Sequence, residues 1–237
     1  MTDSGAIEIV ALDRVEIALE AWRWEFAIAR REDIGRHFAQ RQRAQPELWN
    51  GRVLLVHRYA VVGGVLRGAC FETDYANLLA WVDWGLPDPN VFNLFAAAAL
   101  RGADGGYLVG EMAPTTAASG QLSFPCGTPD VQDLRADGTL DLDFSLAREL
   151  VEETGLDIGA LTVEPGWVLV RDRGFVALMK RLTAPEDAAI LRARILHHLQ
   201  NDAQAEFSDI RIVDGQADLD PHMLRFLAAY LEDVWRR

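Results

Sequence analysis

The sequence is short of cysteine and of basic residues, and these shortages argue against several kinds of protein. Its two cysteines, Cys70 and Cys126, make no metal-binding pattern with each other. They can form one disulfide at most, and two thiols in a chain this size are more typical of a reducing cytosol. Lys and Arg number 23 against 36 Asp and Glu, a formal net charge of −13. We therefore expect no nucleic-acid partner, although a bound cation can still allow a small phosphorylated ligand.

Long hydrophobic runs, internal repeats and low-complexity tracts are also missing. The apolar stretch from Leu94 to Leu100 is far too short to cross a bilayer, so no membrane partner is expected. Met1 to Gly5 offers no basic segment ahead of an apolar one, which predicts no signal peptide and a cytoplasmic protein. The hydrophobic share of 50% is that of a globular protein, and 237 residues fit one large domain or two small ones.

The segment from Arg148 to Leu156 carries the densest chemistry in the chain. Folded as a helix, it places Glu149, Glu152 and Glu153 on one narrow face. The opposite face is apolar and is expected to pack on a core through Phe144, Ala147, Leu150 and Val151. Gly155 is expected to end the helix, and its start is expected to be capped by Asp143 or Ser145.

Three carboxylates this close repel one another, and a cation bound among them relieves the repulsion. Hard carboxylate oxygens favour Mg²⁺ or Mn²⁺, with waters and substrate phosphates completing the coordination. Arg148 lies one helical turn before Glu152 and is placed to orient it. Taken by itself, the acidic string also fits an ordinary solvated helix face.

A second motif lies upstream of the acidic string, in the segment Phe124-Pro125-Cys126-Gly127. Together the two segments, from Gly127 to Leu156, resemble the Nudix box. In that box Gly, five residues, Glu and seven residues precede Arg-Glu-aliphatic-x-Glu-Glu-x-Gly-aliphatic. The second half matches at every specified position from Arg148 to Leu156.

Two positions depart from the family pattern. Cys126 stands where the family usually has the first Gly of a pair, and Leu140 stands where counting back from Arg148 places the first Glu. The chain before Arg148 is also longer than the family spacing, which indicates an insertion in the loop before the helix. Asp141 or Asp143 are the candidates to replace the missing Glu.

The resemblance implies metal ligands. Glu152 and Glu153 would bind the metal with the backbone carbonyl of Cys126, while Glu149 would bind a second metal or activate the water. Family members often draw another acid from a loop far beyond the box. Glu206 is the candidate here because it precedes a predicted strand, and the further candidates are Glu164 and Asp209.

The implied activity is metal-dependent hydrolysis of the diphosphate linkage in a nucleoside diphosphate joined to another group. A nucleotide sugar, ADP-ribose or coenzyme A would each supply such a linkage, so the expected partner is a small nucleotide-type substrate. A second interpretation is a catalytically silent module that binds a nucleotide-type ligand as a sensor or scaffold. The departures at Leu140 and Cys126 favour that alternative.

The fold class expected is α+β. Residues 91–237 are predicted to form a Nudix-type α/β/α sandwich with a mixed sheet, and residues 1–90 a small α+β unit ahead of it. The larger part is read as hairpins at 91–112 and 167–182, helices at 185–199 and 221–235, and a strand at 210–213. The N-terminal unit is read as strands within 7–29, although 22–29 could also be helical. A helix at 31–48, strands at 52–59 and 65–71, and a helix at 73–81 follow.

The N-terminal unit is rich in aromatic residues, and packing inside a core or between the two units is their ordinary explanation. The sharper hypothesis is that Trp49, Tyr75 or Trp84 lines a pocket and stacks on a base or sugar. A contact between two copies in a homodimer is a further explanation. Arginines near predicted turns accompany these aromatics, at Arg41, Arg43 and Arg52.

Overall fold

The protein is described by a computed structural model over residues 6–236. The stretch from Met1 to Gly5, on which the signal-peptide expectation depends, lies outside these residues. Within residues 6–236 no helix is long and apolar enough to cross a membrane. Cys70 and Cys126 are both free thiols.

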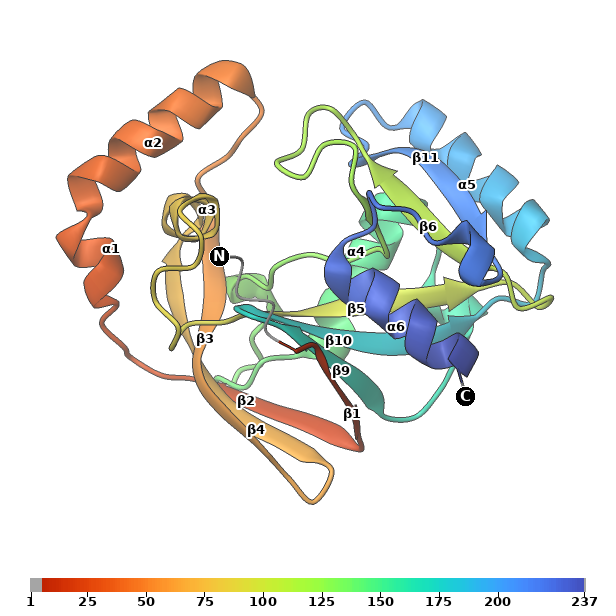
Figure 1. Ribbon diagram of the computed structural model, residues 1–237, viewed down its shortest axis with the longest axis horizontal. Helices are drawn as coiled ribbons and strands as arrows, with labels where there is room; N and C mark the ends of the chain where they lie inside the picture. The colour runs from red at the N-terminus through yellow and green to blue at the C-terminus, as the bar shows by residue number, and fades with distance from the viewer. Residues whose placement is uncertain (1–5, 237) are drawn as a thin grey trace.

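A mixed eight-stranded sheet forms the centre of the larger part (Figure 1). Its order is β1-β9-β10-β5-β6-β11, with β7 paired to β6 and β8 paired to β10. Only β5 and β10 pair in parallel, while the other neighbouring pairs described are antiparallel. The strands are β1 (Glu8–Leu12), β5 (Asn93–Arg101), β6 (Tyr107–Met112), β7 (Leu122–Ser123), β8 (Thr162–Val163), β9 (Trp167–Asp172), β10 (Phe175–Thr183) and β11 (Phe207–Val213).

Helices cover both faces of this sheet, because its central strands bury both sets of alternating side chains. In β5, Leu94, Ala96 and Ala98 pack in one core with leucines of α4 (Leu142–Thr154) and α5 (Ala188–Asn201). The side chains between them, Phe95, Ala97 and Ala99, pack in a second core with α6 (Arg225–Arg236). The α/β/α sandwich with a mixed sheet expected from the sequence is therefore confirmed.

The chain before residue 90 builds a separate three-stranded sheet in the order β2-β4-β3. Figure 1 shows the helices α1 and α2 arching around one side of it, with α3 lying between them and the sheet. The elements are β2 (Arg14–Leu19), α1 (Glu25–Ala29), α2 (Arg31–Ala44), β3 (Arg52–Val62), β4 (Val65–Asp74) and α3 (Tyr75–Asp83). Trp24, Phe71 and Trp81 form the centre of a small core on one face of this sheet.

Two features join this N-terminal part to the rest. Strand β1 does not belong to the small sheet but is the edge strand of the large one, paired with β9. The other face of the small sheet contributes Ile17, Leu54 and Leu66 to the same core that holds the leucines of α4. The division at residue 90 stays a prediction, and the two parts share one core.

Most predicted elements are observed, with ends that move by a few residues. The terminal helix, predicted from Pro221, begins at Arg225. The reason is that residues just before it bond to β7: the carbonyl of His222 accepts from the amide of Leu122, and the amide of Leu224 donates back to the carbonyl of Leu122. The short 3₁₀ turns are η1 (Val131–Asp133), η2 (Ile158–Ala160) and η3 (Gln216–Asp218).

Candidate active site

Helix α4 carries the acidic string and begins slightly earlier than predicted. Asp141 is its N-cap, and the Asp141 carboxylate accepts the amide of Phe144 at 3.1 Å. The expectation of a cap at Asp143 or Ser145 was therefore wrong. Both of these residues lie inside the first turns of the helix. Gly155 ends the helix in the left-handed conformation with φ of 68°, as expected.

The buried face of α4 also differs from the expected one. Leu146, Leu150 and Glu153 face the interior, while Phe144 and Val151 are about half exposed. The expectation assumed that the acids face solvent and the apolar residues face the core. Glu153 is only 2% exposed, so the helix is rotated to bring one of its acids inward. A buried acid on a core-facing helix is costly unless it is bound by a partner.

Arg148 is the hub of the cluster. Its guanidinium lies 2.9 Å from Glu149, 3.1 Å from Glu152 and 3.1 Å from Asp133. Burial alone would lower the pKa of Arg148, but the hydrogen bond to Asp133 and the charge of Glu149 outweigh it and raise that pKa. The orienting role expected of Arg148 toward Glu152 thus has its geometric basis.

The place expected for the first acid of the box is taken by Asp133, which binds Arg148. Leu140, Asp141 and Asp143 do not take this place. The Asp133 side chain is completely buried and also accepts the Ser145 hydroxyl at 3.1 Å and the Asp130 amide at 3.0 Å. Leu140 is buried in the hydrophobic core. The other two aspartates bind cations elsewhere, Asp141 to Arg135 at 2.9 Å and Asp143 to Lys180 at 3.2 Å.

The sequence itself gives the position of Asp133 when the box spacing is counted forward from Gly127. Five residues separate Gly127 from Asp133, which is the box spacing, so the extra residues follow this acid. They form a small turn that joins β2: the carbonyl of Gly138 accepts the amide of Leu19 at 2.8 Å, and the amide of Leu140 donates to Ile17 at 2.8 Å. The insertion thereby ties the box to the N-terminal sheet.

The loop before the insertion contacts α4 at Glu153 and Glu149. The amide of Cys126 donates to the Glu153 carboxylate at 2.8 Å. Gly127 lies so close to Glu149 that a Cβ on it would overlap the Glu149 carboxylate. A side chain at this position would therefore displace the Glu149 carboxylate from the place it occupies. Burial, followed by the charge of Glu153, raises the pKa of the Cys126 thiol, which therefore stays neutral.

Glu206 joins the same cluster from the segment before β11, where its carbonyl accepts the amide of Ala113 at 2.7 Å. Burial and then the charge of Glu152 raise the pKa of Glu206. Burial raises the pKa of Glu149 from 4.5 to about 7 in spite of Arg148. The pKa of Glu153 is raised well above its ordinary value by burial and then by the charges of Glu149 and Glu206.

The other acids considered from the sequence are engaged elsewhere. Glu164 binds Arg101 at 3.1 Å and Arg181 at 2.9 Å. Asp209 binds Arg192 at 2.9 Å. Of the acids proposed beyond the box, only Glu206 reaches the cluster.

The carboxylates do not converge on one point in this structure. Glu149 and Glu152 turn toward Arg148, and Glu153 turns toward the Cys126 amide. Within residues 6–236 no three His, Cys, Asp or Glu side chains form a ready-made metal-binding group. The donor set itself fits a hard divalent cation: it consists of buried carboxylates whose mutual repulsion a cation would relieve. Glu149, Glu152, Glu153 and Glu206 would hold such an ion, with the Cys126 carbonyl as a further oxygen.

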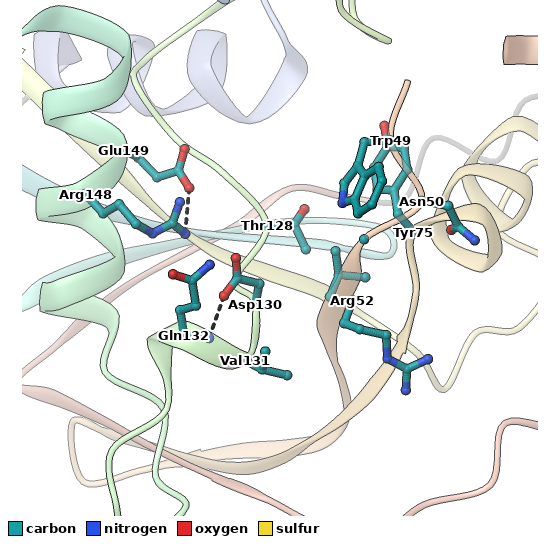
Figure 2. Close-up of a pocket in the computed structure, with 12 residues that line it drawn as sticks. Trp49, Asn50, Arg52, Tyr75, Thr128, Asp130, Val131, Gln132, Arg148 and Glu149 are labelled. Carbon is teal, nitrogen blue, oxygen red and sulfur yellow. Dashed lines mark hydrogen bonds and ion pairs between the residues drawn. The ribbon is translucent and has the colours of Figure 1, made fainter. Parts of the chain in front are cut away.

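A cavity of about 430 Å³ opens beside Glu149 (Figure 2). Arg148 and Glu149 line one side, Thr128 and Asp130 of the box loop lie between, and Trp49 and Tyr75 line the opposite side. The third aromatic considered from the sequence, Trp84, lies elsewhere, with the guanidinium of Arg30 4.7 Å from its ring.

The arginines expected near the cleft contribute little free charge to it. Arg52 lines the cavity, but its guanidinium points away, toward Glu72 and Asp74 at 2.6 Å each (Figure 2). Arg41 lies 3.6 Å from Asp83.

No protein-family model matches this chain, and no curated protein matches it in sequence. Among solved structures it is similar to Nudix hydrolases of several kinds. The Nudix hydrolase RenU from M. smegmatis is 19% identical, with a TM-score of 0.40 over 61% of this chain and 88% of that one. An Ap4A hydrolase from C. elegans is 14% identical, with a TM-score of 0.38 over 60% and 93%. The protein DR0079 from Deinococcus radiodurans is 16% identical, with a TM-score of 0.43 over 78% and 99%.

Proposed function

We propose that the protein is a Mg²⁺- or Mn²⁺-dependent hydrolase that cleaves the diphosphate linkage of a nucleoside diphosphate joined to another group. The observation that carries this proposal is the cluster of four glutamates, Glu149, Glu152, Glu153 and Glu206, beside a cavity of about 430 Å³. A cavity of this size accommodates a nucleotide-sized ligand.

The chain's own groups have separable tasks in this proposal. A divalent cation supplies charge neutralisation of the diphosphate and lowers the pKa of a water that it binds. Glu149, which lines the cavity, would bind a second cation or accept a proton from that water. Arg148 holds Glu149 and Glu152 in position, and the completely buried Asp133 holds Arg148. Gly127 leaves the space that the Glu149 carboxylate occupies.

The competing proposal is a catalytically silent module that binds a nucleotide-type ligand. Two sequence features motivated this competing proposal, and they do not support it equally. The missing Glu at Leu140 counts less, because Asp133 supplies a buried acid to Arg148. Cys126 still departs from the family pattern, although its side chain leaves the backbone carbonyl available as a ligand.

A substrate screen separates the two proposals. ADP-ribose, nucleotide sugars, coenzyme A and dinucleoside polyphosphates would be incubated with Mg²⁺ or Mn²⁺, and the phosphorylated products resolved by chromatography. The hydrolase proposal predicts cleavage of at least one compound between its phosphorus atoms, abolished by a chelator. If every compound stays intact while one of them binds, the silent module is the better description.

A further inference from the structure

Trp49 is the most exposed large hydrophobic side chain among residues 6–236, at 80% of its surface. An indole left in water at the edge of a cavity is an unusual use of the largest aromatic side chain. Its exposure does not reflect a loose loop, because the two residues that follow it are held by hydrogen bonds. The carbonyl of Gly51 accepts the amide of Tyr75 at 2.9 Å, and the Asn50 side chain accepts the amide of Ala76 at 2.8 Å.

These two hydrogen bonds join the Trp49 segment to the first turn of α3, which carries Tyr75. The indole also lies directly over Gly51, where a Cβ would come within 2.9 Å of its Nε1. The wall that carries the two aromatics is tied in turn to the box loop, because Leu54 donates its amide to the carbonyl of Pro129 at 2.7 Å. The aromatic wall is therefore preorganised relative to Glu149.

Tyr75 lines the same cavity as Trp49. Burial raises the pKa of its hydroxyl, and among the charged groups that act on it are Arg41 and Glu206. The cavity thus has aromatic surface on one side and the proposed hydrolytic acids on the other (Figure 2). Base–aromatic stacking needs an exposed, fixed ring, and it tolerates different bases because every base has a π-face.

We infer that the N-terminal part of this chain supplies the base-binding subsite, in which the nucleobase of the substrate stacks on Trp49. The inference rests on the proposed function, which places the diphosphate of the substrate at Glu149 and so sets the orientation of the substrate in the cavity. It adds that recognition of the base is separate from the acids of α4, and that Trp49 determines affinity while leaving the chemical step alone.

Binding without turnover tests this directly. AMP, GMP, CMP and UMP would each be titrated calorimetrically into the full chain with Mg²⁺, with ribose 5-phosphate as the ligand that lacks a base. We expect at least one mononucleotide to bind, and Trp49→Ala to weaken that binding about 5- to 100-fold. Trp49→Phe keeps a ring and is expected to retain most of the affinity. Trp84→Phe, in an aromatic cluster outside the cavity lining, is the matched control and should bind as wild type does.

The outcome is readable whether or not the protein is a hydrolase. If none of the four mononucleotides binds, or if folded Trp49→Ala binds them as tightly as wild type does, the base subsite is wrong. If Trp49-dependent binding is present but the substrate screen gives no cleavage, the subsite stands and the hydrolase proposal fails. With an active enzyme, Trp49→Ala should raise KM and leave kcat nearly unchanged. An unchanged KM would also overturn the inference.

Discussion

Replacing Asp133 by asparagine removes the negative charge that faces Arg148 inside the protein and hardly changes the shape of the side chain. The wild-type carboxylate is completely buried and accepts hydrogen bonds from Arg148, Ser145 and the amide of Asp130. An asparagine has only one acceptor oxygen for these donors. Its NH₂ group must lie near one of them, and that donor loses its partner.

The size of the effect follows from burial. Removing one partner of a buried ion pair typically costs about 3–5 kcal/mol. Arg148 keeps Glu149 and Glu152 as partners and is 21% exposed, so we expect a smaller loss of about 2–3 kcal/mol in the free energy of unfolding. For a protein of this length, each kcal/mol shifts Tm by about 2–4 °C, which predicts a fall of about 4–12 °C.

Thermal unfolding followed by circular dichroism measures this shift. Asp137→Asn is the matched control, because Asp137 lies in the exposed turn of the same insertion, where asparagine can also accept from the amide of Thr139. Its Tm should stay within about 2 °C of wild type. If Asp133→Asn also unfolds within about 2 °C of wild type, the buried pair does not stabilise the protein and Asp133 is not the acid that secures Arg148.

Three further predictions concern the charges of the site. First, folding raises the pKa of Glu149 from its ordinary value of 4.5 to about 7. As pH rises through that window, the metal-free protein therefore loses about 3 kcal/mol of its free energy of unfolding. Added Mg²⁺ should therefore raise Tm more at pH 7.5 than at pH 5.5, and an equal rise at both would contradict this. Second, Glu153→Gln should not lower the Tm of the metal-free protein at pH 7.5, because it removes a buried charge that folding disfavours; a clear loss of Tm would show that the charge stabilises. Third, both arginines of the cavity are paired with carboxylates, so dephospho-coenzyme A should be bound more tightly than coenzyme A, which carries one more phosphate; calorimetric affinities in the reverse order would refute this.

The general architecture could be predicted from the sequence because it depends on local patterns. The residues of β10 alternate between the two cores, and Gly155 ends α4 with the backbone angle that favours glycine. The three glutamates of α4 and the more distant Glu206 were also named from sequence as metal ligands, and that role stays a prediction.

What could not be predicted depends on contacts between distant segments. The rotation of α4 was missed because pattern reading places acids in solvent, whereas Glu153 is buried against the amide of Cys126. Asp133 is an exception, because counting forward from Gly127 finds it, and it was missed only because the count ran backward from Arg148 through the insertion. The sequence did not distinguish Trp49 from Trp84 as a candidate to line a pocket. Only the hydrogen bonds between the Gly51 region and α3 place Trp49 at the cavity.

Glu152→Gln and Glu153→Gln should both leave folding intact, but for different physical reasons. A solvated acid contributes little to stability, and the side chain of Glu152 is 57% exposed. The side chain of Glu153 is buried, and the fold disfavours its charged form.

The central claim, that the acids of α4 form a catalytic metal site, is tested most directly by the kcat of Glu153→Gln on the best substrate of the screen, at saturating Mg²⁺. Glutamine retains an oxygen that can accept the Cys126 amide, so the fold is kept while a charged ligand is lost. Charge stabilisation by a catalytic metal amounts to several kcal/mol, so the account predicts a fall in kcat of at least about 100-fold. A folded Glu153→Gln protein that turns over at a near-wild-type rate would contradict it.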